Sequence, residues 1–80
     1  MPPRLPTDPA LGYAIRQMRE QRRRTQEELA SAAGLTFGTV NRLESAKSAP
    51  AWATVRALLD ALEYSLADLA KAIAAAERRS

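Results

Sequence analysis

Basic side chains are the residues through which this 80-residue chain could do chemistry, and they gather in its first half. Residues 1–47 carry eight Lys and Arg against five Asp and Glu, whereas residues 48–80 carry four of each. The formal net charge of +3 therefore belongs to the first part of the chain. Such an uneven distribution favours a face that attracts a polyanion. The charge alone is equally compatible with an ordinary solvated surface.

The sequence contains few residues of the types that carry out catalysis. The chain contains no Cys and no His, which removes thiol nucleophiles, imidazole acid–base catalysis and the usual ligands of zinc. Glu27 and Glu28 are adjacent in a segment expected to be helical, so their carboxylates do not face each other. We therefore expect a protein that is not an enzyme and that has no metal site and no cofactor.

The expected compartment follows from the same composition. Small secreted domains usually need disulfides, so the lack of Cys favours a reducing interior. No apolar run approaches the roughly 18–20 residues that a membrane span needs, and residues 1–9 lack the apolar segment of a signal peptide. We expect a cytoplasmic protein with no membrane partner.

The composition favours an all-α fold in a single domain, because Ala, Leu, Arg and Glu dominate and Gly is sparse. Four of the five prolines lie in residues 1–9, which we interpret as a flexible arm whose Arg4 could touch a phosphate backbone. Apolar spacing predicts helices over 10–24, 25–33, 37–44 and 50–62, and a fifth helix that starts at 65, runs through the Ala-rich stretch 70–76 and ends in residues 77–80. We divide the chain into the arm, a domain over 10–70 and a helical tail over 71–80.

Cap residues support these boundaries. Asp8 precedes the first helix, Thr25 with Glu28 and Ser65 with Asp68 form capping-box patterns, and Thr36 precedes the third helix. Gly34 suits the left-handed position that ends the second helix. The fourth helix has an apolar face that consists of Trp52, Val55, Leu58, Leu59 and Leu62.

Gln26 to Leu43 is the segment most informative about function. Two short helices that cross closely need a small residue at the crossing, which Ala30 supplies. The turn between them needs a left-handed residue, which Gly34 supplies, and Val40 places an aliphatic side chain between the helices. This is the helix-turn-helix arrangement, in which the second helix projects from the domain and can enter a DNA major groove.

From about Leu11 to Leu69 the sequence resembles the phage-repressor and Cro-like helix-turn-helix domains, also called the XRE type. The resemblance is carried by Ile15-Arg16-x-x-Arg19, Thr25-Gln26-Glu27-Glu28-Leu29-Ala30, Ala33-Gly34-Leu35-Thr36, Val40-x-x-Leu43-Glu44, Lys47, Pro50, Leu58-x-x-x-Leu62 and Ser65-Leu66-x-x-Leu69. It implies a compact, five-helix, lambda-repressor-like fold that binds double-stranded DNA.

The same resemblance implies roles for individual residues. Base contacts are expected from four positions of the recognition helix: Phe37, Gly38, Thr39 and Arg42. Phosphate contacts are expected from Gln26, Asn41, Ser45 and Lys47, to which we add Arg23 and Arg24 because of their charge. Gln26 is also expected to brace the recognition helix. Arg19 and Glu44 are expected to form a partly buried, structural salt bridge.

Three positions depart from the family pattern. Ala46 stands where Gly is common, and a positive φ there would cost on the order of 1 kcal/mol. Phe37 and Gly38 stand where polar residues are common, and neither side chain makes the paired hydrogen bonds that identify a purine. Sequence readout is therefore expected to rest on Arg42, which could fork onto a guanine.

These observations predict a sequence-specific transcriptional regulator, a repressor that binds a near-palindromic operator as a homodimer. The 3-4-3 spacing of Leu66, Leu69, Ile73 and Ala76 predicts a dimer seam on the last helix. Two alternatives remain open. The chain could be an antitoxin that binds its own operator and a toxin protein, or a protein-interaction module on a scaffold that no longer binds DNA, which Phe37 and Gly38 would favour.

Overall fold

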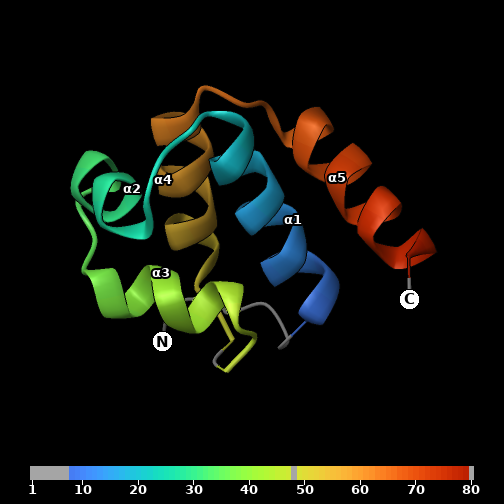
Figure 1. The fold of residues 1–80 in the computed structure, drawn as a ribbon, viewed down its shortest axis with the longest axis horizontal. Coiled ribbons are helices and arrows are strands. Elements are labelled where there is room, and N and C mark those ends of the chain that lie inside the picture. Colours follow the sequence, from blue (N-terminus) through green and yellow to red (C-terminus); the bar gives the residue numbers. More distant parts are fainter. Residues whose placement is uncertain (1–7, 48, 80) are drawn as a thin grey trace.

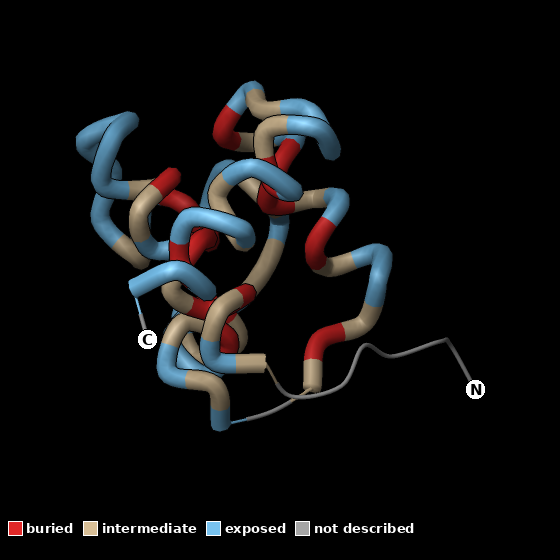
Figure 2. Tube along the Cα trace, turned by 90° about the vertical axis from the view of Figure 1, so that its right-hand side faces the viewer, coloured by how far each residue is buried: buried red, intermediate tan, exposed pale blue. Residues whose placement is uncertain are grey.

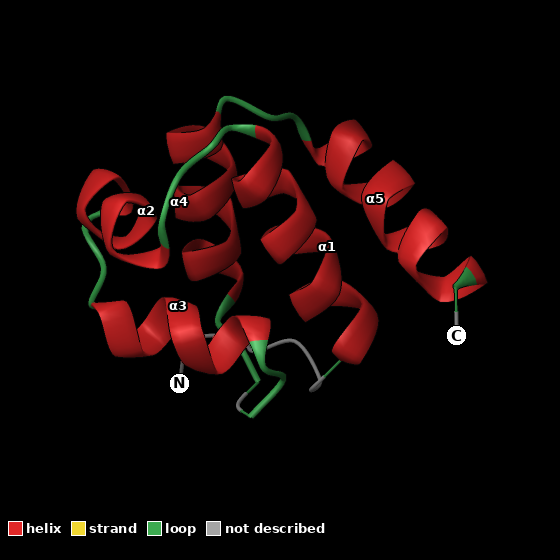
Figure 3. Cartoon of the chain, in the orientation of Figure 1, coloured by secondary structure: helices red, strands yellow, loops and turns green. Residues whose placement is uncertain are grey.

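The computed structural model describes residues 8–47 and 49–79, so the expectations for residues 1–7 of the proline-rich arm, Arg4 included, lie outside the described residues, whereas Pro9 already belongs to the first helix. The described regions contain five helices connected by short loops (Figures 1 and 3). They are α1 (Pro9–Gln21), α2 (Gln26–Ala33), α3 (Phe37–Glu44), α4 (Trp52–Leu62) and α5 (Leu66–Arg78). None of the described helices is long and apolar enough to cross a membrane.

Local side-chain caps begin four of the helices, as their sequences predict. The Asp8 side chain accepts from the Ala10 N–H at 2.9 Å before α1. Complete capping boxes join Thr25 to Glu28 at α2 and Ser65 to Asp68 at α5, and the Thr36 hydroxyl accepts from the third residue of α3. Each cap satisfies backbone donors that the first helical turn leaves without partners.

Each of the helices α1 to α4 is followed by a residue with a left-handed backbone conformation. Among these four residues only Gly34 (φ 70°) is a glycine. The other three are Arg23 (φ 55°), Ala46 (φ 57°) and Glu63 (φ 60°). At Ala46, the amides of residues 46 and 47 donate to the carbonyls of Leu43 and Arg42, which is the paired hydrogen-bond pattern of a Schellman end. The predicted extent of the first helix to Arg24 is therefore wrong, because the chain turns at Arg23.

The start of α4 also differs from the prediction. The helix begins at Trp52 with Ala51 as its N-cap, and Pro50 lies before the cap. Val55, Leu58, Leu59 and Leu62 are buried, but Trp52 is 38% exposed. The predicted apolar face is thus correct except in the first turn, where Trp52 lies at the margin of the core.

The core is one continuous cluster at the centre of the bundle (Figure 2). Helix α1 packs against α3 and α5, and α2 packs against α3 and α4. Ile15, Leu29, Val40 and Leu58 are among the residues with almost no exposed surface. This packing holds α3 at the edge of the bundle, with one side buried and the other open to solvent.

Helix α5 lies along the outer side of α1, away from α2 and α3 (Figure 1). Leu69 and Ala76 are buried, and Ile73 packs against the chain's own core. The seam that the spacing predicted for a second copy is therefore used within the monomer. Leu66, the first residue of that seam, is 43% exposed.

Candidate nucleic-acid interface

Helix α3 turns two different faces to its surroundings. Val40 and Leu43 are buried beneath it, because they fall on the side that meets α1 and α2. The open face carries the exposed residues Phe37, Asn41, Arg42 and Ser45, which we call the α3 face. A helix that binds in a DNA groove needs a row of exposed side chains and a firm attachment to a packed bundle, and α3 has both.

A close backbone contact sets where α3 crosses α1. Gly12 of α1 is buried, and a Cβ at this position would lie 2.6 Å from the Leu43 carbonyl oxygen and 2.9 Å from that of Glu44. Real Cβ atoms do not approach backbone oxygens so closely, so only glycine allows this crossing. The role of Gly12 could not be predicted from the sequence, because nothing near it in the chain indicates a contact with residues thirty positions away.

A polar network joins α1, α2 and α3 beside the α3 face. Arg19 donates to both carboxylate oxygens of Glu44, from Nε at 2.8 Å and from Nη2 at 3.0 Å. The two side chains are only 12% and 3% exposed, so this is the partly buried ion pair that the resemblance implied. The side-chain hydrogen bonds with Glu44 raise the pKa of Arg19 above its usual value.

The network continues from Glu44 to the surface through two amides. Gln26 Nε2 donates to Glu44 Oε1 at 3.0 Å, and Asn41 Nδ2 donates to Gln26 Oε1 at 3.1 Å. Gln26 thus connects the start of α2 to the exposed side of α3. Its side chain braces α3 from within the protein.

Comparison with known proteins agrees with this geometry. The model of the helix-turn-helix family HTH_3 matches residues 15–69, which include α2, α3 and the network around Glu44. The chain belongs to this helix-turn-helix family. Membership identifies it as a DNA-binding transcriptional regulator, with α3 in the place of the recognition helix. No curated protein sequence is significantly similar to the chain.

Solved structures of other helix-turn-helix regulators have a similar fold. Two crystal structures of the clp gene regulator ClgR from Corynebacterium glutamicum are 30% and 28% identical to the chain, with TM-scores of 0.79 and 0.81. The matches cover 84% and 92% of this chain and 71% and 95% of those chains. The restriction-modification controller protein C.Esp1396I, in a mutant form, is similar in fold, with 17% identity, a TM-score of 0.82 and coverage of 86% and 92%.

Arg42 has the most available side chain on the recognition helix. Among the described residues its guanidinium has no hydrogen bond or ion pair, and it folds back along α3 over Gly38. A Cβ at position 38 would lie 3.1 Å from Arg42 Nη1, so the glycine leaves room for this conformation. Gly38 and the guanidinium of Arg42 thus lie next to each other on the surface of the helix-turn-helix.

The other residues predicted to contact bases are less available. The Thr39 hydroxyl is shared with the Thr36 cap at 2.9 Å, and Thr39 is half-buried. Phe37 is 49% exposed and has no polar atom on its side chain. Ser45, which was predicted to contact phosphate, donates from its hydroxyl to the Asn41 carbonyl at 2.7 Å, which leaves the oxygen free only as an acceptor.

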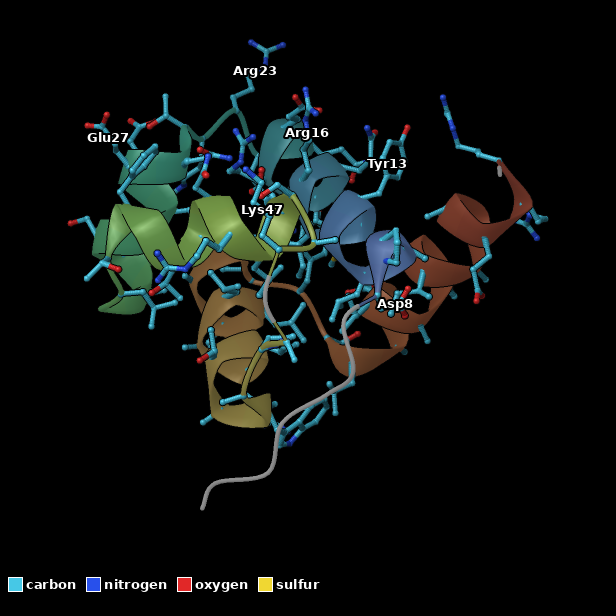
Figure 4. The ribbon with its side chains drawn as sticks, turned by 90° about the horizontal axis from the view of Figure 1, so that it is seen from below. Asp8, Tyr13, Arg16, Arg23, Glu27 and Lys47 are labelled. Atoms are coloured by element: carbon cyan, nitrogen blue, oxygen red, sulfur yellow. The ribbon has the colours of Figure 1, made fainter. Side chains whose placement is uncertain are left out.

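Four basic residues lie beside the helix-turn-helix and are exposed: Arg16, Arg23, Arg24 and Lys47. Arg16 and Arg23 project from the same side of the molecule, and Lys47 lies in the loop after α3 (Figure 4). Arg24 is exposed in the turn before α2, whereas its carbonyl accepts from Arg19. Arg16 was not predicted to contact phosphate, although its spacing of three residues from Arg19 places both on one helical side.

Arg22 belongs to a different part of the structure. Its guanidinium donates to the Leu62 carbonyl at 2.9 Å and to the Glu63 carbonyl at 3.3 Å, and lies 4.0 Å from the centre of the Tyr64 ring. It therefore satisfies the carbonyls that end α4. In the sequence it stands beside Arg23 and Arg24, but its contacts come from forty residues further along the chain.

Proposed function

We propose that the chain is a sequence-specific repressor that binds a near-palindromic operator as a homodimer, in the cytoplasm. The observation that carries the proposal is the α3 face, which stands open while Val40 and Leu43 anchor the helix beneath it. The buried ion pair of Arg19 with Glu44 holds the same helix from its end. A rigid, exposed helix next to basic residues is suited to insertion into the major groove.

Binding begins with electrostatic attraction and continues with two kinds of contact. Arg16, Arg23 and Arg24 supply positive charge beside the recognition helix, which raises affinity for any duplex. Gln26 at the start of α2 and Lys47 after α3 contact phosphates and set the register. The backbone amide of Gln26 at this helix start is a donor for a phosphate oxygen.

Sequence discrimination rests first on Arg42. Its guanidinium has a planar pair of donors that matches O6 and N7 of guanine, and it has no hydrogen-bond or ion-pair partner within residues 8–47 and 49–79 to give up. Gly38 supports this contact because the missing side chain lets the helix backbone approach the bases. Phe37 adds an apolar contact that suits the methyl group of thymine.

A homodimer follows from the limited reach of one recognition helix. A single α3 contacts only part of one turn of DNA, whereas a two-fold pair reads two half-sites about 34 Å apart. A bound pair covers the promoter and excludes the transcription machinery, which is repression by occlusion.

Selection of bound sequences from a random DNA pool tests this function. We expect two inverted half-sites, each with a guanine, whose centres are separated by about 10 base pairs. A single site without symmetry would overturn the homodimer. Binding that is absent at low salt, or unchanged between low and moderate salt, would overturn DNA binding itself.

A further inference from the structure

The hydrogen bonds of Glu44 have a fixed direction that extends to the protein surface. An ionised carboxylate only accepts hydrogen bonds. Glu44 is 3% exposed and takes its bonds from Arg19 and Gln26. Gln26 must therefore turn its NH₂ group toward Glu44, and its oxygen must point the other way.

The orientation of the Gln26 side-chain amide in turn fixes the orientation of the Asn41 side-chain amide. Because the oxygen of Gln26 faces Asn41, the Asn41 side chain must donate from Nδ2, as it does at 3.1 Å. The opposite orientation would place two amide oxygens against each other. Oxygen and nitrogen of an amide have nearly the same shape, but here the donors and acceptors of the network determine which is which.

We propose that Asn41 reads an adenine through this imposed orientation, instead of the phosphate contact expected from the sequence. Its Oδ1 and its second Nδ2 hydrogen have no partner among the described residues and lie on the exposed side of α3. In the major groove, adenine presents the N6 donor and the N7 acceptor that match this pair. A phosphate presents acceptors only, which would set the Asn41 oxygen against negative charge.

The inference rests on the proposed function, because it requires α3 to lie in the major groove. Within that function, Asn41 contacts an adenine and its neighbour Arg42 contacts a guanine. Gln26 and Glu44 become positioning residues that act through Asn41. The discrimination would then depend on a carboxylate that never touches DNA.

Base analogues at single positions of the selected site test the reading by Asn41. We expect one adenine per half-site at which 7-deazaadenine, which lacks N7, and purine, which lacks the N6 amino group, each weaken wild-type binding about tenfold. In Asn41→Ala the same replacements cause no further loss. Ser31→Ala, which removes an exposed polar side chain elsewhere on α2, serves as the control and keeps both losses.

Two results would overturn the reading. Asn41→Ala could weaken all sequences by one factor while both analogue losses persist, which is the behaviour of a phosphate contact. Wild-type protein without any salt-dependent duplex binding would overturn the proposed function together with this inference. The first result leaves the proposed function intact, so the two failures are distinguishable.

A second variant tests the relay from Glu44. Gln26→Met keeps the length of the side chain and removes its donor and acceptor. We expect discrimination at this adenine to fall about threefold while discrimination at the guanine read by Arg42 persists. Loss of fold would lower both equally, and unchanged discrimination at the adenine would overturn the relay.

Discussion

Gly12 of α1 lies directly against the carbonyl oxygen of Leu43 near the end of α3, where a Cβ would stand 2.6 Å from that oxygen. Both partners of the contact are backbone atoms, so no side-chain rotation can make room. The contact brings α1 and the recognition helix closer than other residues would permit. The angle at which α3 is presented therefore depends on a residue that does not belong to the helix-turn-helix.

Replacing Gly12 with Ala is expected to lower the free energy of unfolding by about 1–3 kcal/mol, since α1 and α3 must move apart. Gly38→Ala is the matched control, because its Cβ would meet only the flexible end of Arg42. There the better helix propensity of Ala should preserve or raise stability. Thermal unfolding of both variants measures the difference, and equal stabilisation by both would contradict the role of Gly12.

Replacing Arg42 with Ala is expected to weaken binding to the preferred site by about 1–3 kcal/mol and to relax the preference for guanine at one position. The physical reason is the loss of a guanidinium with no other partner among the described residues. Arg56→Ala on the exposed side of α4 removes the same charge away from the α3 face. If Arg42→Ala leaves base preference unchanged, the recognition helix reads sequence by other residues.

Replacing Lys47 with Ala is expected to weaken binding to all duplexes by a similar factor, because a phosphate contact carries no base information. The slope of log affinity against log salt should fall by about one unit of charge. Titrations at several salt concentrations, with preferred and random DNA, measure both quantities. A loss confined to the preferred site would instead indicate a base contact.

Replacing Ala46 with Gly is expected to raise the free energy of unfolding by about 0.5–1 kcal/mol. The backbone at Ala46 has φ 57°, a conformation that costs energy in any residue with a Cβ and none in glycine. Ala32→Gly within α2 is the control and should destabilise, because the helical backbone gains nothing from glycine. Denaturant titration compares the two, and a stability loss in Ala46→Gly would refute the strain.

Glu28 links stability to pH. Hydrogen bonds from Thr25 hold the pKa of the Glu28 carboxylate below its usual value, so folding stabilises the ionised form. This contribution is complete above the pKa of the unfolded chain and is lost as the pH falls through the lower folded pKa. Unfolding measured from about pH 6 to about pH 3 should show a smaller loss in Glu28→Gln than in wild type.

Local signals in the sequence determined the helices and most of their ends. Caps such as Thr25 and Ser65 bond to backbone amides within one turn, so their partners could be predicted from spacing alone. Gly34 marked its turn because glycine favours a left-handed backbone. The turns at Arg23 and Glu63 carry no glycine although both residues have a positive φ, so no local signal marked them.

Only the tertiary structure decided which polar and small residues meet. The side chain of Arg22 donates to a carbonyl at the end of α4, and the missing side chain of Gly12 leaves room for α3. The orientation of the Asn41 amide is set by Glu44 through Gln26. It also placed Ile73 against the chain's own core, where the spacing had predicted a seam for a second copy. These contacts join residues far apart in the chain, and no local pattern of charge or hydrophobicity specifies a partner at that distance.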